Sequence, residues 1–287
     1  MTQYQIANIR INVSGVESNF FHMRMKEYVA KNIQESDINI TYSNADEISL
    51  PKGRTIGEAH RWTWIDTQDN KIAAYQWHPI LNKNISLIEA DKDFSNVRIQ
   101  LCDFENSYGI SNERRCFFAI GEVFHYAILK TNGLVLHSSS IDYDGNAILF
   151  SAPSGTGKTT HTQMWENTYK DKTNIINDDT PAIRFVDNVP YAFGTPWCGK
   201  TEKNKNISAP IKAIVFLQRA NENEIIPLTG AWAVSLMLNE VRKSVFPELM
   251  EQSLHMINKI ISNVPVYQLS CNISEEAVNL VKNTLSL

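Results

Sequence analysis

Residues 152–160, with the sequence Ala-Pro-Ser-Gly-Thr-Gly-Lys-Thr-Thr, carry the clearest chemical pattern in the chain. The pattern matches the phosphate-binding loop G-x-x-x-x-G-K-S/T, except that Ala152 replaces the first glycine. Glycines let the backbone N–H groups of such a loop turn toward a phosphate, a lysine supplies positive charge, and a hydroxyl can coordinate Mg²⁺. The alternative is a glycine-rich turn that caps an ordinary helix. The residues expected to bind ATP are Ser154, Gly155, Thr156, Gly157, Lys158, Thr159 and Thr160, and Thr159 is also expected to bind the metal.

Two neighbouring carboxylates, Asp178 and Asp179, follow the short apolar stretch Ile175-Ile176 and Asn177. Successive side chains at the end of a strand point in different directions, so the two can serve different roles. One could hold the Mg²⁺ of a nucleotide, and the other could accept a proton from an attacking hydroxyl. Without the phosphate loop upstream, the same residues would be read as a turn before Thr-Pro.

Two further segments could join the same site. His137 follows an apolar stretch. The strand that contains it is expected to form a hairpin with the strand that precedes the phosphate loop. A lone histidine, however, is often a core or surface residue. Residues 194–206 contain two glycines and the three lysines Lys200, Lys203 and Lys205. This segment suits a mobile lid over an active site, or else an exposed loop. Its lysines are either solvated or available to an anionic substrate.

The elements that must position these residues have an α/β pattern with hairpins. Helices are expected over residues 115–130, 158–169, 231–244, 247–262 and 274–285. Strands are expected over residues 134–142, 146–151, 174–177, 182–186, 189–193, 211–218, 224–228 and 266–269. The phosphate loop therefore lies between a strand and a helix, as its chemistry requires.

The N-terminal region has the pattern of a smaller α+β domain without a chemical signature. Strands are expected over residues 5–13 and 37–42, a helix over 19–33, and hairpins over 60–78 and 85–103. The polar stretch 105–112 is the candidate linker. We therefore expect a domain over residues 1–112, with a role in substrate recognition, and a catalytic domain over 113–287.

Composition excludes several classes of protein. The chain has 287 residues, 43% hydrophobic and 20% charged, and its formal net charge of −4 indicates neither a nucleic-acid nor a membrane partner. Its four cysteines are scattered, so a disulfide scaffold or a thiolate metal site is not expected. The N-terminus lacks the pattern of a signal peptide, and no apolar run approaches the ~20 residues of a membrane span. We expect a cytoplasmic protein, and a homo-oligomer is left open.

Taken in order, these segments resemble the kinase fold shared by phosphoenolpyruvate carboxykinase and the C-terminal domain of HPr kinase/phosphorylase. In the carboxykinases a segment like M-H-C-S-A-N precedes G-L-S-G-T-G-K-T-T, then G-D-D and G-G-C-Y-A-K. Here the corresponding segments are L-H-S-S-S, A-P-S-G-T-G-K-T-T, N-D-D and G-T-P-W-C-G-K. The resemblance covers about residues 113–287 and implies a P-loop kinase domain of the HPr kinase/phosphoenolpyruvate carboxykinase type. It implies catalytic roles for His137, Lys158, Asp178 and Asp179, and metal binding by Thr159, Asp178 and His137.

The function that the resemblance implies is an ATP-dependent kinase using Mg²⁺, with Mn²⁺ as an alternative. It would transfer the γ-phosphoryl group to a hydroxyl, with a serine of a peptide or protein as the favoured acceptor, because the closest likeness is to small HPr-kinase-like proteins, some of which phosphorylate peptides. The chain lacks the arginine cluster of an oxaloacetate site and the downstream signature of the phosphorylases. A metabolite kinase and a non-catalytic nucleotide-sensing or peptide-binding module remain as alternatives.

Overall fold

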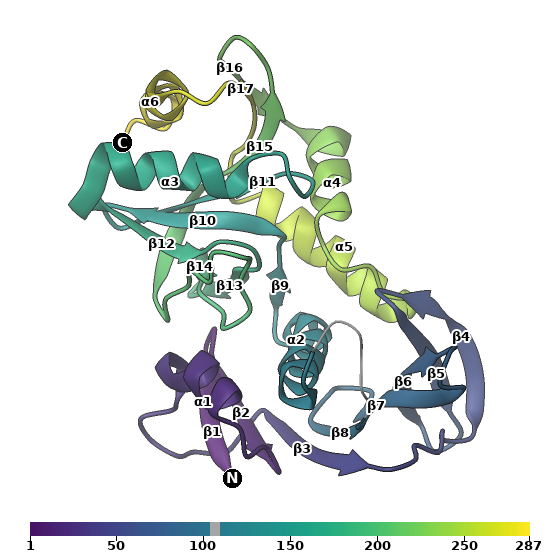
Figure 1. Ribbon diagram of the computed structural model, residues 1–287. Coiled ribbons are helices and arrows are strands. Elements are labelled where there is room, and N and C mark those ends of the chain that lie inside the picture. The colour runs from purple at the N-terminus through teal and green to yellow at the C-terminus, as the bar shows by residue number, and fades with distance from the viewer. Residues whose placement is uncertain (104–109) are drawn as a thin grey trace. The chain divides into compact units, whose positions relative to one another are not determined.

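The computed structural model describes residues 1–103 and 110–287 (Figure 1). These residues form two compact units, and each unit contains one β-sheet together with α-helices. The first unit comprises Met1–Thr131 and Lys243–Met250, and the second comprises Asn132–Arg242 and Glu251–Leu287. Of the expected linker, residues 105–109 lie outside the described residues. Within the described part of the chain, no helix has the length and apolar character that crossing a membrane requires.

The boundary between the units differs from the one expected near residue 112. The helix α2 (Asn112–Lys130) belongs to the first unit, although the sequence assigned it to the second. Its aromatic side chains explain the difference: Phe117 packs 6.2 Å from Phe21, and Tyr126 packs 5.1 Å from Trp64, both centroid to centroid. The helix therefore builds the core of the unit that precedes it.

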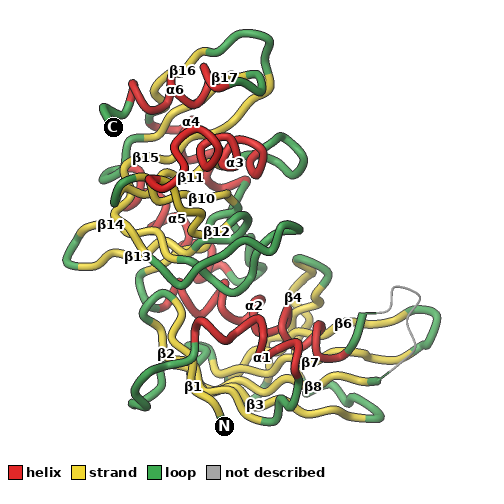
Figure 2. The backbone as a smooth tube through the Cα atoms, turned by 60° about the vertical axis from the view of Figure 1, so that its left-hand side comes forward, coloured by secondary structure: helices red, strands yellow, loops and turns green. Residues whose placement is uncertain are grey.

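The first unit contains an eight-stranded sheet in the order β1-β2-β3-β8-β7-β6-β5-β4. Its strands are β1 (Thr2–Ile6), β2 (Ile9–Ser14), β3 (Ile38–Ala45), β4 (Gly53–Ala59), β5 (Trp62–Thr67), β6 (Lys71–His78), β7 (Lys83–Asp91) and β8 (Asn96–Cys102). The strand expected over residues 5–13 is two strands, because Ala7 and Asn8 have φ of 49° and 59° and turn the chain into a hairpin. Figure 2 shows α1 (Asn19–Met25) and α2 against this sheet.

The second unit contains a nine-stranded sheet in which β12-β10-β11-β15-β14-β13-β9 form one path and β17 and β16 extend it beside β15. Its strands are β9 (Gly133–Val135), β10 (Ser138–Tyr143), β11 (Asn146–Ser151), β12 (Thr173–Asn177), β13 (Ala182–Val186), β14 (Val189–Phe193), β15 (Ser208–Arg219), β16 (Glu224–Leu228) and β17 (Val266–Cys271). The pairs β11/β15 and β15/β17 are parallel, and the other pairs are antiparallel. A strand expected over residues 134–142 is divided into β9 and β10, which lie at different places in the sheet.

Four α-helices lie wholly or mostly in the second unit of the described chain: α3 (Lys158–Tyr169), α4 (Gly230–Asn239), α5 (Pro247–Ile261) and α6 (Glu275–Thr284). The first residues of α5 belong to the first unit. Helix α3 packs on β10, β11 and β12 and is seen along that part of the sheet in Figure 1. It buries Trp165 completely, with ring centroids 5.3 Å from Tyr143 and 5.4 Å from Tyr169. This aromatic core holds α3 on the sheet and so fixes where the helix begins.

Candidate functional site

The phosphate-loop pattern occupies the turn between β11 and α3. Gly155 and Gly157 have φ of 81° and 124°, in the left-handed region that favours glycine. Gly157 is the N-cap of α3, and no side chain forms a capping hydrogen bond there. The first N–H groups of the helix are therefore not capped by a side chain, and they carry the positive end of the helix dipole. A strand, a glycine turn and a helix N-terminus together have the geometry of an anion-binding site.

Lys158 is held at the mouth of this loop. Its side-chain nitrogen Nζ donates to the Ala152 carbonyl oxygen at 2.6 Å and lies 3.0 Å from Nε2 of His137. Burial lowers the pKa of Lys158, while the carboxylates of Glu240 and Asp179 act in the opposite direction. Ala152, which departs from the loop pattern, contributes its backbone oxygen, so the side-chain difference does not disturb this contact.

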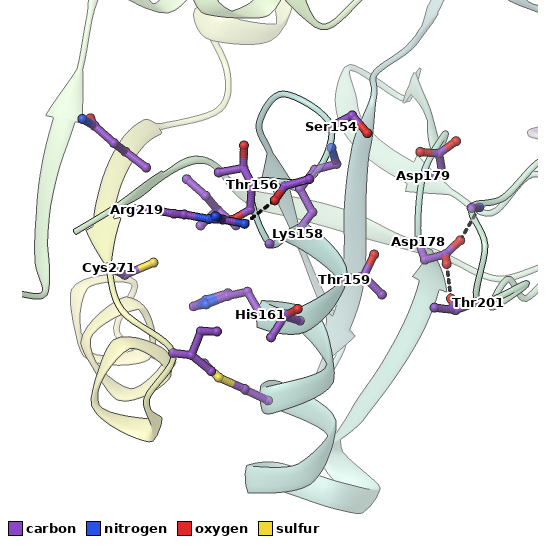
Figure 3. Close-up of a pocket in the computed structure, with 18 of the residues that line it drawn as sticks. Ser154, Thr156, Lys158, Thr159, His161, Asp178, Asp179, Thr201, Arg219 and Cys271 are labelled. Carbon is purple, nitrogen blue, oxygen red and sulfur yellow. Dashed lines mark hydrogen bonds between the residues drawn. The ribbon is translucent and has the colours of Figure 1, made fainter. Parts of the chain in front are cut away.

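A pocket of about 850 Å³ surrounds the loop. Figure 3 shows Asp178, Asp179 and Thr201 on one side of the loop, and Arg219 and Cys271 on the other. The pocket contains all seven residues expected to bind ATP and all four residues expected to be catalytic. Its lining comprises His137, Ser154, Gly155, Thr156, Gly157, Lys158, Thr159, Thr160, His161, Met164, Asp178, Asp179, Gly199, Lys200, Thr201, Leu217, Gln218, Arg219, Ala220, Cys271, Asn272 and Ile273.

The side chain of Asn177 shapes the turn that carries the two carboxylates. Its Oδ1 accepts hydrogen bonds from the backbone N–H groups of Asp179 (2.8 Å) and Thr180 (2.7 Å). Its Nδ2 donates to the carbonyl oxygens of Thr195 and Trp197, both at 2.9 Å. Because the oxygen and the nitrogen of this buried amide both form hydrogen bonds with the backbone, they stabilise the turn at the end of β12. The sequence did not identify Asn177 as a positioning residue.

Asp178 and Asp179 have different surroundings. Asp178 is 2% exposed, and its oxygens accept hydrogen bonds from the Gly199 N–H at 2.7 Å and from the Thr201 hydroxyl. The side chain of Asp179 is 38% exposed, and its Oδ1 lies 3.4 Å from Nε2 of His137. The two carboxylates therefore face different partners, as expected, and Asp179 is the more accessible one.

His137 lies between β9 and β10, at the point where the chain passes from one part of the sheet to another. Its backbone N–H donates to the Glu240 carbonyl oxygen at 2.8 Å, and its Nδ1 lies 2.7 Å from Oε2 of the same residue. Contacts with Asp179 and Glu240 raise the pKa of His137 to about 9. Glu240 follows α4 and is far from His137 in the sequence, so no local pattern could identify it.

Buried serine hydroxyls connect the elements around His137. Ser139 and Thr162 of α3 exchange a hydrogen bond of 2.9 Å between their hydroxyls. Ser140 donates to the Asn177 carbonyl oxygen at 3.1 Å, and Ser151 donates to the His137 carbonyl oxygen at 2.9 Å. Small side chains allow these elements to approach closely while every one of these hydroxyls keeps a partner.

Residues 194–206 are fastened along most of their length, which corrects the interpretation of the whole segment as a mobile lid. Lys203 pairs with Glu166 at 2.6 Å, and Lys205 donates to the Asn174 side-chain oxygen at 2.6 Å. The Lys205 N–H also donates to a backbone oxygen of β12, at 3.0 Å. Of this segment, only residues 199–201 line the pocket, so Lys200 is the lysine that can reach a ligand there.

Arg219, at the end of β15, is a second residue that the sequence did not identify. Its Nε donates to the Thr156 carbonyl oxygen at 3.1 Å, and its Nη2 donates to the Gly155 carbonyl oxygen. These contacts hold the outward-facing carbonyls of the loop. The arginine is the last residue of a strand and belongs to no recognisable motif. Its contact with the loop depends on the pairing of β11 with β15.

The residues present fit Mg²⁺ held together with phosphates. Thr159 and Asp178 both line the pocket and supply the hard oxygen ligands that Mg²⁺ prefers. In the described residues no group of three or more His, Cys, Asp and Glu side chains is arranged to hold a metal, so the protein alone offers no complete cage. Mg²⁺ commonly binds through one or two carboxylates plus substrate phosphates, which is what this site can provide.

Comparison with known proteins gives one family. The model of the family described as SynChlorMet cassette protein ScmC matches residues 101–285, well over half of the chain. No protein of curated function matches the sequence significantly. Among solved structures, the Hpr(Ser) kinase/phosphatase from Coxiella burnetii is a distant neighbour, with 10% identity and a TM-score of 0.31 over 52% of this chain and 95% of that one. A similarity at this level carries no argument about function.

Proposed function

The chain belongs to the family described as SynChlorMet cassette protein ScmC, and we propose that it is an ATP-dependent phosphotransferase. Its second unit is proposed to be a P-loop kinase domain of the HPr kinase type, and its first unit to serve acceptor recognition. The reaction would transfer the γ-phosphoryl group of ATP to a hydroxyl, with a serine of a peptide or protein as the acceptor. A cytoplasmic location, where ATP is available, belongs to the same proposal.

One observation carries this proposal: the phosphate loop and an accessible carboxylate open on the same pocket. Lys158 and the N-terminus of α3 supply positive charge on one wall, and Asp179 lies on another. His137 links them, because its Nε2 lies 3.0 Å from Lys158 Nζ and 3.4 Å from Asp179 Oδ1. A phosphate group bound by the loop would therefore lie close to a group that can accept a proton.

The loop residues and the two carboxylates have defined parts in the proposed reaction. Lys158 and the loop N–H groups bind the β- and γ-phosphates and stabilise the charge that develops there. Asp179 accepts the proton of the acceptor hydroxyl while the oxygen forms its bond to the γ-phosphorus, and the bond to the β–γ bridging oxygen breaks to release ADP. Thr159 and Asp178 would hold Mg²⁺, which would neutralise part of the phosphate charge.

A carboxykinase reaction is disfavoured by the scarcity of arginines in the described lining of the pocket. Oxaloacetate has two carboxylates, which require several convergent positive groups. Arg219 is the one arginine among the described residues that line the pocket, and two of its nitrogens already bind loop carbonyls. Phosphorylation of a hydroxyl does not require several convergent positive groups for the acceptor.

The test is a transfer screen with the full chain and ATP labelled at the γ-phosphate, with Mg²⁺ or Mn²⁺. The acceptors are serine peptides, common hydroxyl metabolites and oxaloacetate, and Lys158→Ala is the control. We expect label on a serine hydroxyl and none with Lys158→Ala. Label confined to a metabolite would replace the peptide acceptor, and nucleotide-dependent conversion of oxaloacetate to phosphoenolpyruvate would overturn the proposal.

A further inference from the structure

Glu240 forms the closest side-chain contact of His137, and the proposed reaction gives it no role. Its side chain is 8% exposed, and its Oε2 lies 2.7 Å from Nδ1 of His137. Glu240 is the C-cap residue of α4, where its N–H donates to the Met237 carbonyl oxygen at 3.1 Å. A nearly buried carboxylate is costly unless it is paired, so its placement here requires an explanation.

The backbone already joins the two segments without this side chain. The His137 N–H donates to the Glu240 carbonyl oxygen at 2.8 Å, and Leu136 and Val241 form an antiparallel bridge. These contacts fix the position of the chain that follows α4. The carboxylate therefore adds something that the backbone contacts do not supply, namely control of the imidazole ring.

A carboxylate determines how the ring is used. Because an ionised carboxylate can only accept hydrogen bonds, Nδ1 must carry the proton in the contact with Glu240. The ring is then held with Nε2 toward the pocket, between Lys158 Nζ at 3.0 Å and Asp179 Oδ1 at 3.4 Å. A hydrogen-bond partner on one ring nitrogen commonly sets the role of the other.

We propose that Glu240 is a positioning residue of this site, which holds the His137 ring so that Nε2 meets Lys158 and Asp179. The inference deepens the proposed function and depends on it only for the effect on turnover. In this role α4 contributes to the site through its C-terminal end, although no residue of α4 lines the pocket.

The first test compares kinetics of Glu240→Ala, Glu240→Gln and the control Glu251→Ala, a glutamate that is exposed on α5. We expect Glu240→Ala to lower kcat about 10–100-fold, the range found for residues that orient a metal-ligating histidine. KM for Mg·ATP should change little, since Glu240 does not contact the phosphate loop. Glu240→Gln keeps an acceptor oxygen and should recover most of kcat, and Glu251→Ala should match the wild type.

The second test uses ligand-free protein and needs no activity. The Nδ1 proton of His137, assigned by its loss in His137→Gln, should give a downfield NMR signal that exchanges slowly with water. In Glu240→Ala we expect that signal to shift upfield and to exchange faster. If Glu240→Ala does not fold, Glu240→Asp, which is shorter by one methylene, takes its place.

The outcomes distinguish the positioning role of Glu240 from the proposed phosphotransferase function. An unchanged Nδ1 signal in Glu240→Ala overturns the positioning role, as does equal loss by the alanine and glutamine variants with a parallel fall in stability. A changed signal in a protein that transfers no phosphate supports the positioning of His137 and contradicts only the proposed function.

Discussion

The backbone N–H of Gly199 donates to Oδ1 of Asp178 at 2.7 Å, which ties the segment over the pocket to a carboxylate expected to bind metal. The approach is close, since a Cβ at residue 199 would lie 3.2 Å from Oδ2 of Asp178. The hydroxyl of Thr201 binds the same carboxylate. Asp178 therefore has a structural role in the ligand-free protein in addition to the role proposed for it in catalysis.

Asp178 and Asp179 should be separable by substitution. We expect Asp179→Asn to reduce turnover by roughly 10²–10⁴ with nucleotide affinity largely intact, because it removes the proton acceptor. Asp178→Asn should raise the Mg²⁺ concentration needed for half-maximal activity, and should loosen residues 199–201 toward proteases. Steady-state kinetics with Mg²⁺ titration checks both, and near-normal kinetics from both variants would leave the pair as a simple turn.

Gly194→Ala should destabilise the second unit. A Cβ at this position would lie 1.8 Å from the carbonyl oxygen of Lys205, so residues 194 and 205 must move apart. We expect a loss of about 1–3 kcal/mol in the free energy of unfolding, typical of overpacking, measured by urea denaturation. The exposed Ser235→Ala in α4 is a control that should stay near the wild-type value. Unchanged stability of Gly194→Ala would show that the segment is not fastened as described.

Trp165→Ala should cost about 3–5 kcal/mol in the free energy of unfolding, because it leaves a large cavity beneath α3. The side chain is fully buried against Tyr143, Phe150 and Tyr169. Trp232→Ala is the matched control, since that tryptophan is 69% exposed. A small effect at Trp165, similar to that at Trp232, would contradict the packing of α3.

Stability should fall in mild acid because of His161. Burial lowers the pKa of His161 to about 4, and its Nε2 accepts a hydrogen bond from Trp165 Nε1 at 3.3 Å. The unfolded state, with an ordinary pKa near ~6.5, takes up a proton before the folded state does. The stabilisation is therefore complete above pH ~6.5 and is lost as the pH falls toward 4, by about 2 kcal/mol between pH 7 and pH 5.

Urea denaturation between pH 7.5 and pH 5 measures this dependence. His161→Gln should show a shallower decline than the wild type, and His255→Gln, which changes an exposed histidine, should not. Parallel pH profiles for the wild type and His161→Gln would exclude His161 as the cause.

Local sequence patterns predicted the strand and the helix on either side of residues 152–157. The bounds of β11 and α3 agree with the expected residues 146–151 and 158–169. Both depend on local signals: an apolar strand, a glycine turn and a helix whose buried residues recur at helical spacing. The order of the loop and the two aspartates was likewise visible, because each lies within a short stretch of chain.

The remaining parts of the site depend on pairing between distant segments, which no local pattern encodes. Glu240 meets His137 because the chain after α4 forms a bridge beside it, and Arg219 meets the loop because β15 pairs in parallel with β11. The sequence predicts one continuous strand over residues 134–142, but these residues contribute to two strands: β9, which pairs with β13, and β10, which pairs with β11. The assignment of α2 to the first unit follows from aromatic packing that its own periodicity does not reveal.

Calorimetric titration of the full chain with ATP, with and without Mg²⁺, in the wild type and in Lys158→Ala, tests whether residues 152–160 bind a nucleotide. We predict saturable binding that requires Mg²⁺ and is weakened about 10–100-fold or more in Lys158→Ala, because a charge-assisted hydrogen bond to phosphate is worth about 1.5–3 kcal/mol. Lys172→Ala, which changes a lysine with a side chain 63% exposed, is the control and should bind as the wild type does. Absence of ATP binding in the wild type, or equal affinity in Lys158→Ala, would contradict the assignment of residues 152–160 as a nucleotide-binding loop.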